Sequence, residues 1–159
     1  MSSQIYRAQD RIVSLLAADE FFTDPDPTKV IAVLSQRHGD LANELARVLS
    51  DAGIGVTVML PVVGWEGRGI NIALGLRFTI FVSENPVVNQ TTKRAEDVME
   101  KIFKILQWKP NGAINSTNPM HQASKFQIGN PAARLMAPTK DHPTILNYAL
   151  TINTIVTLV

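Results

Sequence analysis

The sequence contains no cysteine, and this absence excludes several kinds of site. Without thiols the chain has no disulfide, thiolate zinc site, cysteine-held iron–sulfur cluster or cysteine nucleophile. Aromatic residues are few, at 6 %, and no apolar run approaches the ~18 residues that a membrane-spanning helix needs. Neither sign of charge dominates, because 15 Lys and Arg stand against 14 Asp and Glu. A dedicated nucleic-acid binder or a polybasic membrane binder is therefore poorly supported.

What the sequence does contain suits a globular protein. Its 159 residues are 45 % hydrophobic and 18 % charged, which is enough apolar surface for a core in a single domain over residues 1–159. The first ten residues have no apolar segment typical of a secretory signal. We therefore expect a soluble intracellular protein.

A long alternating pattern is the most informative feature of the chain. From Ile70 to Val82 every second residue is large and apolar, and the residues between are mostly polar or small. This period of two predicts one long strand with a polar face, hence an antiparallel or mixed sheet covered on one side. Such a strand either bends at Gly75 or projects beyond its domain. With residues 56–63 it would form a long hairpin, an arm over 56–84 with its glycine-rich tip at 64–69.

The other elements follow from spacing and from chain breakers. Apolar residues at helical spacing predict helices over 4–18, from Gly39-Asp40 to a glycine cap at Gly53, and over 93–108. Strands are predicted at 30–34, 56–62, 126–128, 133–137 and 146–158, and a polar loop at 111–125. The expected fold is α/β (α+β): a mixed, largely antiparallel sheet with a long β-hairpin, packed on two to three helices.

No pattern of catalytic residues stands out. The three histidines, His38, His121 and His142, are scattered in predicted turns, so we expect no catalytic residues, no metal site, no cofactor and no enzyme activity. The glycines at 64–69 precede a strand, whereas a phosphate-binding loop opens a helix. Ser35–Gly39 does lie between a strand and a helix. An alternative hypothesis is therefore a flavodoxin-like small-ligand or nucleotide-binding protein built on 30–60, with Arg37 contributing.

The two tryptophans suggest different environments. Trp65, in the glycine-rich tip, is either a folded-back core residue or an exposed anchor of the kind found at protein interfaces. Trp108 closes the third predicted helix on its apolar side. We expect it to cover the core.

The order of these elements resembles the tail-terminator or tail-completion proteins of long-tailed bacteriophages. The resemblance rests on Glu84–Asn89 leading into Ala95–Ile102, on Leu106-Gln-Trp-Lys-Pro110, and on the final strand at Asn147–Asn153. It covers about residues 4–22 and 56–158, whereas Val30–Gly53 departs from the compact form of the family and could be an insertion.

The resemblance implies a structural virion protein of the tail or neck, assembled in the host cytoplasm. Members of the family form rings, commonly hexamers, which cap the tail tube, end its polymerisation and offer the surface that joins the head. The expected partners are further copies of the chain, the tail-tube protein, and sheath and head-connector proteins, with DNA only passing through the lumen. Another head–tail connector or a baseplate component is a further alternative. The predicted subunit or tube interface residues are Trp65, Arg68, Arg77, Lys125 and Arg134.

Overall fold

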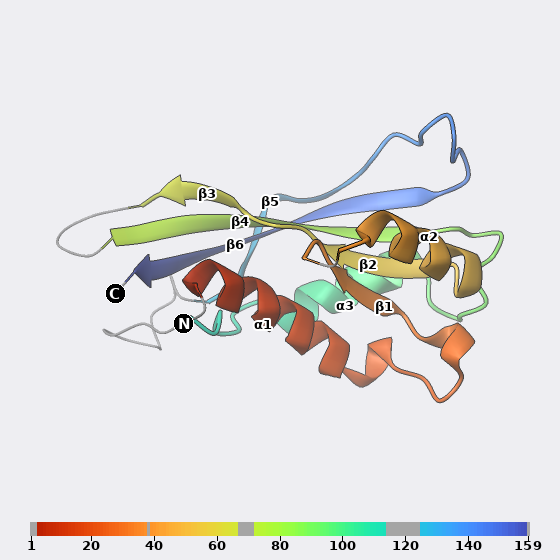
Figure 1. Ribbon diagram of the computed structural model, residues 1–159, viewed down its shortest axis with the longest axis horizontal. Helices are drawn as coiled ribbons and strands as arrows, with labels where there is room; N and C mark the ends of the chain where they lie inside the picture. The colour runs from red at the N-terminus through yellow and green to blue at the C-terminus, as the bar shows by residue number, and fades with distance from the viewer. Residues whose placement is uncertain (1–2, 38, 67–71, 114–124, 159) are drawn as a thin grey trace.

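The computed structural model describes residues 3–37, 39–66, 72–113 and 125–158, and its centre is a mixed sheet (Figure 1). Five strands follow the order β1-β2-β4-β6-β5, and a sixth, β3, also pairs with β4. Among the described strand pairs only β1–β2 is parallel, which confirms the expected fold class. The strands are β1 (Ala32–Ser35), β2 (Ile54–Val58), β3 (Val62–Trp65), β4 (Ile72–Glu84), β5 (Gln127–Leu135) and β6 (Leu146–Leu158), and the α-helices are α1 (Gln4–Ala18), α2 (Leu41–Asp51) and α3 (Ala95–Leu106).

Two long antiparallel strands, β4 and β6, form the middle of the sheet. They pair without interruption from Ile72 opposite Leu158 to Glu84 opposite Leu146. The alternation predicted for β4 is confirmed, because Leu76, Phe78 and Ile80 are almost fully buried while Arg77 is exposed. One side of β4 therefore faces the core over most of its length.

The main core lies between this side of the sheet and the helices α1 and α3. Ala8, Ile12 and Leu16 recur at helical spacing along α1 and are fully buried. Ser3 caps α1, since its hydroxyl accepts a hydrogen bond from the Tyr6 amide (3.0 Å). The large apolar side chains of α3 join those of α1, β2, β4 and β6 in one cluster.

The remaining helix, α2, covers the opposite side of the sheet, contrary to the expectation of a sheet covered on one side. A β-carbon on Gly55 would lie 2.8 Å from the Val48 side chain of α2, although Ile54 and Val56, its neighbours in β2, belong to the main core. All five residues of β2 are buried, as expected of a strand between two helical layers. The alternation in β4 could not show this, because α2 lies over β1 and β2.

The predicted strand over 56–62 is wrong in its extent. Residues 54–58 form β2 and pair with the second half of β4, whereas β3 pairs with its first half, at residues 74–77. Pro61 lies between the two strands, and proline has no amide to donate to a ladder. The part that projects is consequently smaller than the expected arm at 56–84, since β2 is part of the core.

The remaining strands differ less from expectation. The first begins at Ala32, after a short 3₁₀ helix at Pro27–Lys29, and not at Val30. The strands predicted at 126–128 and 133–137 are one strand, β5, whose register shifts between Ile128 and Ala133. A bulge of this kind interrupts the alternation that a single regular strand would show, so the sequence suggested two strands.

Two buried polar groups connect elements that are distant in sequence. Thr154, an exception on the apolar face of β6, is buried. Its hydroxyl accepts from the Asn111 side-chain amide (2.9 Å) and donates to the Lys125 carbonyl (3.1 Å). Glu84, at the end of β4, accepts from the Ala95 amide at the start of α3. Both groups are satisfied, which is the condition for burying polar atoms at low cost.

Trp108 does not cover the core, contrary to expectation. Its backbone has a φ of 65°, and its amide donates to the Phe126 carbonyl (2.9 Å). This turn directs the chain away from the axis of α3 and leaves the indole 47 % exposed. Periodicity placed the residue on the apolar face only because the helix was expected to continue to it.

Candidate assembly surface

The sheet extends beyond the helices as an arm. We define the arm as β3 with its following residue Glu66, residues 72–77 of β4 and residues 153–158 of β6. Val62 lies opposite Arg77, and Trp65 lies opposite Leu74. Figure 1 shows β3 and the start of β4 projecting past the end of α1. The side chains on β3 and at Ile72 and Leu158 are therefore exposed, whereas Leu76 and Val156, nearer the helices, are buried.

One side of the arm carries an apolar patch. The register places Trp65 and Val63 on the same side as Leu74 and Leu76, which is the side that faces α1 and α3 further along the sheet. Leu76 is 2 % exposed, whereas Trp65 is 70 % exposed. The apolar patch consists of Val63, Trp65, Ile72, Leu74 and Leu158. Contiguous exposed apolar surface of this kind marks interaction sites.

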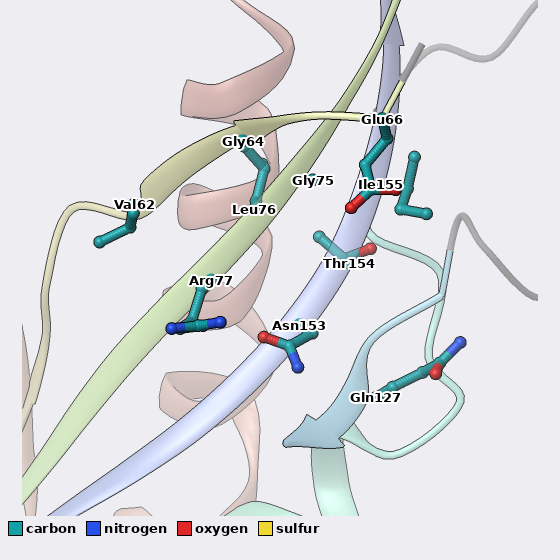
Figure 2. A pocket seen from close by; sticks show the side chains of 10 residues that line it. All are labelled: Val62, Gly64, Glu66, Gly75, Leu76, Arg77, Gln127, Asn153, Thr154 and Ile155. Atoms are coloured by element: carbon teal, nitrogen blue, oxygen red, sulfur yellow. The ribbon is translucent and has the colours of Figure 1, made fainter. Parts of the chain in front are cut away.

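The other side of the arm is hollowed, as Figure 2 shows. Gly64 and Gly75 lie directly opposite each other on β3 and β4. The space above Gly64 is open, whereas the Glu66 side chain lies over Gly75. The glycine hollow has a volume of about 360 Å³. The side chains around it come from all three strands of the arm and from β5: Val62, Glu66, Arg77, Gln127, Asn153 and Ile155.

The outer edge of β3 is open. Within the described residues β3 pairs only with β4, and Val62-Val63-Gly64-Trp65 contains neither a charge nor a proline. Proteins usually protect edge strands with charges, prolines or bulges. The edge strand β5 has Pro131 and a register shift, and β3 has neither device.

The predicted interface residues do not all meet. Trp65 and Arg77 both lie on the arm, on opposite sides of the sheet. Arg134 lies on β5, beside a second hollow that it shares with Phe81 and Ala149. Lys125 is half-buried where the chain returns to the sheet, in a backbone bridge with Pro110. Arg68 falls outside the described residues.

Several members of this surface could not be recognised from the sequence. Val63 belongs to a segment expected to pair along its whole length, and Ile72 and Leu158 were assigned to the buried faces of their strands. Alternation shows which side of a strand a residue occupies, but the length of the covering helix decides whether that side is buried. The Gly64–Gly75 pair depends on register, which a turn of unknown length leaves open.

The alternative hypothesis places an anion at the loop Ser35–Gly39. In the structure, Arg37 of this loop contacts other residues of the same chain. Arg37 donates from Nε to Oε1 of Gln9 (2.7 Å), and its guanidinium lies 4.8 Å from the centre of the Tyr6 ring. Two acidic residues lie at the start of α2, with Asp40 at the N-cap and Glu44 in the first turn. Acidic groups there compete with an anionic ligand for the positive end of the helix dipole. His38 falls outside the described residues.

The described residues contain no group of three or more His, Asp or Glu placed to hold a metal ion. His142 is exposed in a turn, as expected, and His121 falls outside the described residues. The buried carboxylate of Glu84 accepts from the Ala95 amide and from the Asn89 side-chain amide. Within the described part of the chain, every α-helix is too short or too polar to span a bilayer.

Comparison with known proteins identifies no family for the chain: no protein-family model matches it, and no curated protein is significantly similar to it in sequence.

Proposed function

We propose that the protein is a structural subunit of a phage-type tail, which assembles with itself into a ring at the end of the tail tube. The observation that carries the proposal is the arm, on which apolar residues are exposed beside an open strand edge. Exposed apolar surface is costly in water unless a partner covers it. The tail setting rests on the resemblance to tail-terminator proteins of four segments: Glu84–Asn89, Ala95–Ile102, Leu106–Pro110 and Asn147–Asn153.

The geometry of the arm suits contacts between subunits. Trp65 is the kind of residue that anchors protein interfaces, because it removes a large area from water at little entropic cost. The open edge of β3 offers unpaired backbone groups to a neighbouring chain. An arm that reaches beyond its own helices can contact a neighbour without the two cores clashing.

In this function the ring has six subunits, stops polymerisation of the tail-tube protein and provides the surface to which the head connector binds. Sheath protein is a further partner, DNA passes through the lumen, and the protein resides in the tail or neck of the virion. The near-balanced charge fits protein partners, since 15 basic against 14 acidic residues give no general attraction to DNA. A connector or baseplate position is the alternative within the same class.

The flavodoxin-like alternative has less support. It requires a ligand at the β1–α2 loop, where Arg37 contacts Gln9 and Tyr6 and where Asp40 and Glu44 lie at the start of the helix. Chemical-shift perturbation with nucleotides and flavins tests it. Shifts confined to Ser35–Asp40 would favour the alternative over a ring protein.

The proposal is tested by the native mass of the pure protein, measured by multi-angle light scattering over a concentration series and followed by negative-stain imaging. We expect a mass near six protomers and ring-shaped particles, either alone or after addition of tail tubes. The variant Val87→Ala should assemble as the wild type does, because Val87 is 82 % exposed but lies outside the arm. A strictly monomeric protein that also fails to bind tail tubes would refute the proposal.

A further inference from the structure

We propose that Trp65 of one subunit inserts into the glycine hollow of the next subunit, so that the arms join head to tail. This inference rests on the proposed function and names the contact through which the ring forms. The apolar patch and the glycine hollow lie on opposite sides of the same strands. Each subunit therefore presents a projecting side chain on one side of its arm and a hollow on the other.

The projecting side chain has little cover from the described residues of its own chain. Trp65 is 70 % exposed on β3, and Val63 on the same side is 45 % exposed. Leu74, opposite Trp65, keeps only part of its surface exposed. The indole consequently stands at the outer end of an apolar surface, where a neighbour can reach it without moving the core.

The hollow matches an indole in size and chemistry. A β-carbon on Gly64 would meet no atom nearer than the Gly75 carbonyl oxygen at 3.9 Å, so the space above Gly64 is open, and the Glu66 side chain over Gly75 forms one wall of it. Val62 and Ile155 supply apolar walls, and Arg77 borders the hollow (Figure 2). A guanidinium stacks favourably on an indole face. The indole N–H is a donor, and the side chains of Glu66 and Asn153 offer oxygen acceptors.

A second copy of the chain is the occupant that uses both surfaces. Trp65 cannot reach the hollow of its own arm, because the sheet separates them. Because the two surfaces lie on opposite sides of the sheet, a two-fold contact that stacks two arms face to face through their patches would leave both hollows unused. A head-to-tail contact uses each surface once per subunit, and repeated contacts of this type close into a ring when their rotation allows.

The contact is tested with two variants: one removes the inserting side chain, and the other fills the hollow. Trp65→Ala removes the side chain that inserts, and Gly64→Val fills the hollow at a position where a β-carbon meets only ordinary contacts. Both positions are on the exposed arm, so both variants are expected to fold, which circular dichroism and a cooperative thermal transition verify. We expect each variant alone to be monomeric where the wild type forms rings, with association at least about thirtyfold weaker.

Mixing the two variants gives the decisive measurement. Trp65→Ala keeps its hollow and Gly64→Val keeps its tryptophan, so an equimolar mixture has one intact contact per pair. We expect light scattering to show a mass of two protomers in the mixture and no larger species. Trp108→Ala is the matched control, since it removes the other exposed indole outside the arm, and it should assemble as the wild type does.

Other results separate this inference from the proposed function. If the wild type forms rings and either variant alone also forms them, the contact is wrong while the proposed function stands. A mixture that stays monomeric, although the wild type assembles, would overturn the head-to-tail arrangement. A wild type that remains monomeric, alone and with tail tubes, would overturn both.

Discussion

Glu84 is a buried carboxylate whose contacts stabilise the fold. Its carboxylate is 1 % exposed, and its two oxygens accept from the Ala95 amide (3.0 Å) and the Asn89 side-chain amide (2.6 Å). The Arg94 guanidinium lies 3.5 Å from the same carboxylate. The Glu84–Asn89 segment, on which much of the resemblance rests, therefore joins the end of β4 to the start of α3.

Replacing this carboxylate by an amide should destabilise the protein. In Glu84→Gln the new NH₂ group faces either the Ala95 amide or the Asn89 side chain, and both of these are donors. We expect a loss of about 1–3 kcal/mol in the free energy of unfolding, measured by urea denaturation. Glu100→Gln, on the exposed side of α3, should change it by less than about 0.5 kcal/mol. Equal effects of the two substitutions would refute the assigned role.

The titration of Tyr148 tests a contact between β6 and α3. Its hydroxyl donates to Oε1 of Glu96 (2.9 Å), and this hydrogen bond, together with partial burial and the nearby negative charge, raises the pKa of Tyr148. In the Tyr6→Phe background Tyr148 is the only tyrosine. Its tyrosinate absorbance should then show a midpoint above the ordinary value of ~10, and Glu96→Gln should lower it.

The same shift sets the sign of a pH effect on stability. Because the folded pKa exceeds the unfolded one, the Tyr148–Glu96 contact contributes its full stabilisation below pH ~10 and loses it as the pH rises through the folded value. Unfolding experiments in that range should show the Tyr6→Phe protein losing more stability than its Glu96→Gln derivative. An identical dependence in both proteins would contradict the contact.

Single residues were the hardest to predict from the sequence. Thr154 interrupts the apolar alternation of β6. Its burial depends on a hydrogen bond from the side chain of Asn111, which lies 43 residues away. The exposure of Trp108 depends on a backbone turn beside β5. Both results come from contacts between distant segments, and neither leaves a local pattern.

At the scale of elements, the end of α2 offers a direct test. Gly53 has a φ of 81°, and a β-carbon there would lie 2.4 Å from the Asn89 backbone nitrogen. Gly53→Ala combines left-handed strain with a clash against backbone, so it should cost more than about 2 kcal/mol of unfolding free energy. Thermal or urea unfolding measures the loss.

Gly39→Ala is the matched control for this substitution. Gly39 precedes the same helix, and a β-carbon there would meet no atom within 4 Å. Its effect should stay within about 1 kcal/mol and should be stabilising if it restricts the unfolded chain. A loss at Gly39 as large as that at Gly53 would show that neither effect depends on the geometry of the cap.

Elements with strong local patterns were predicted well, and elements defined by their neighbours were not. The helix at 4–18, the glycine cap at Gly53 and the long strands β4 and β6 follow from periodicity and turn residues, and the structure confirms them. The side of the sheet that α2 covers depends on the crossover between β1 and β2. The predicted strand at 56–62 is divided between β2 and β3 because these two strands pair with different halves of β4.

At the scale of the whole molecule, the nature of the arm predicts how assembly responds to salt. The apolar patch has no charged member, and the formal net charge of the chain is only +1. The affinity between subunits should therefore change by less than about threefold between low and moderate NaCl, because screening acts on charges. Sulfate should strengthen it, since excluded salts favour apolar burial.

Sedimentation velocity across a NaCl series and a sulfate series measures this response. Trp65→Ala should lose the sulfate effect along with assembly. A steep loss of affinity with NaCl would instead show that ion pairs between charged side chains hold the subunits together.

The arm also has a mechanical consequence. β4 and β6 each run for thirteen residues from the core into the arm, with continuous pairing and no loop between the two parts. The arm is thus a cantilever whose direction is fixed by the twist of the sheet. In a ring, the angle from one subunit to the next is then determined inside each subunit as well as at the contact. A core substitution that alters the twist would change the diameter of the ring without touching its interface.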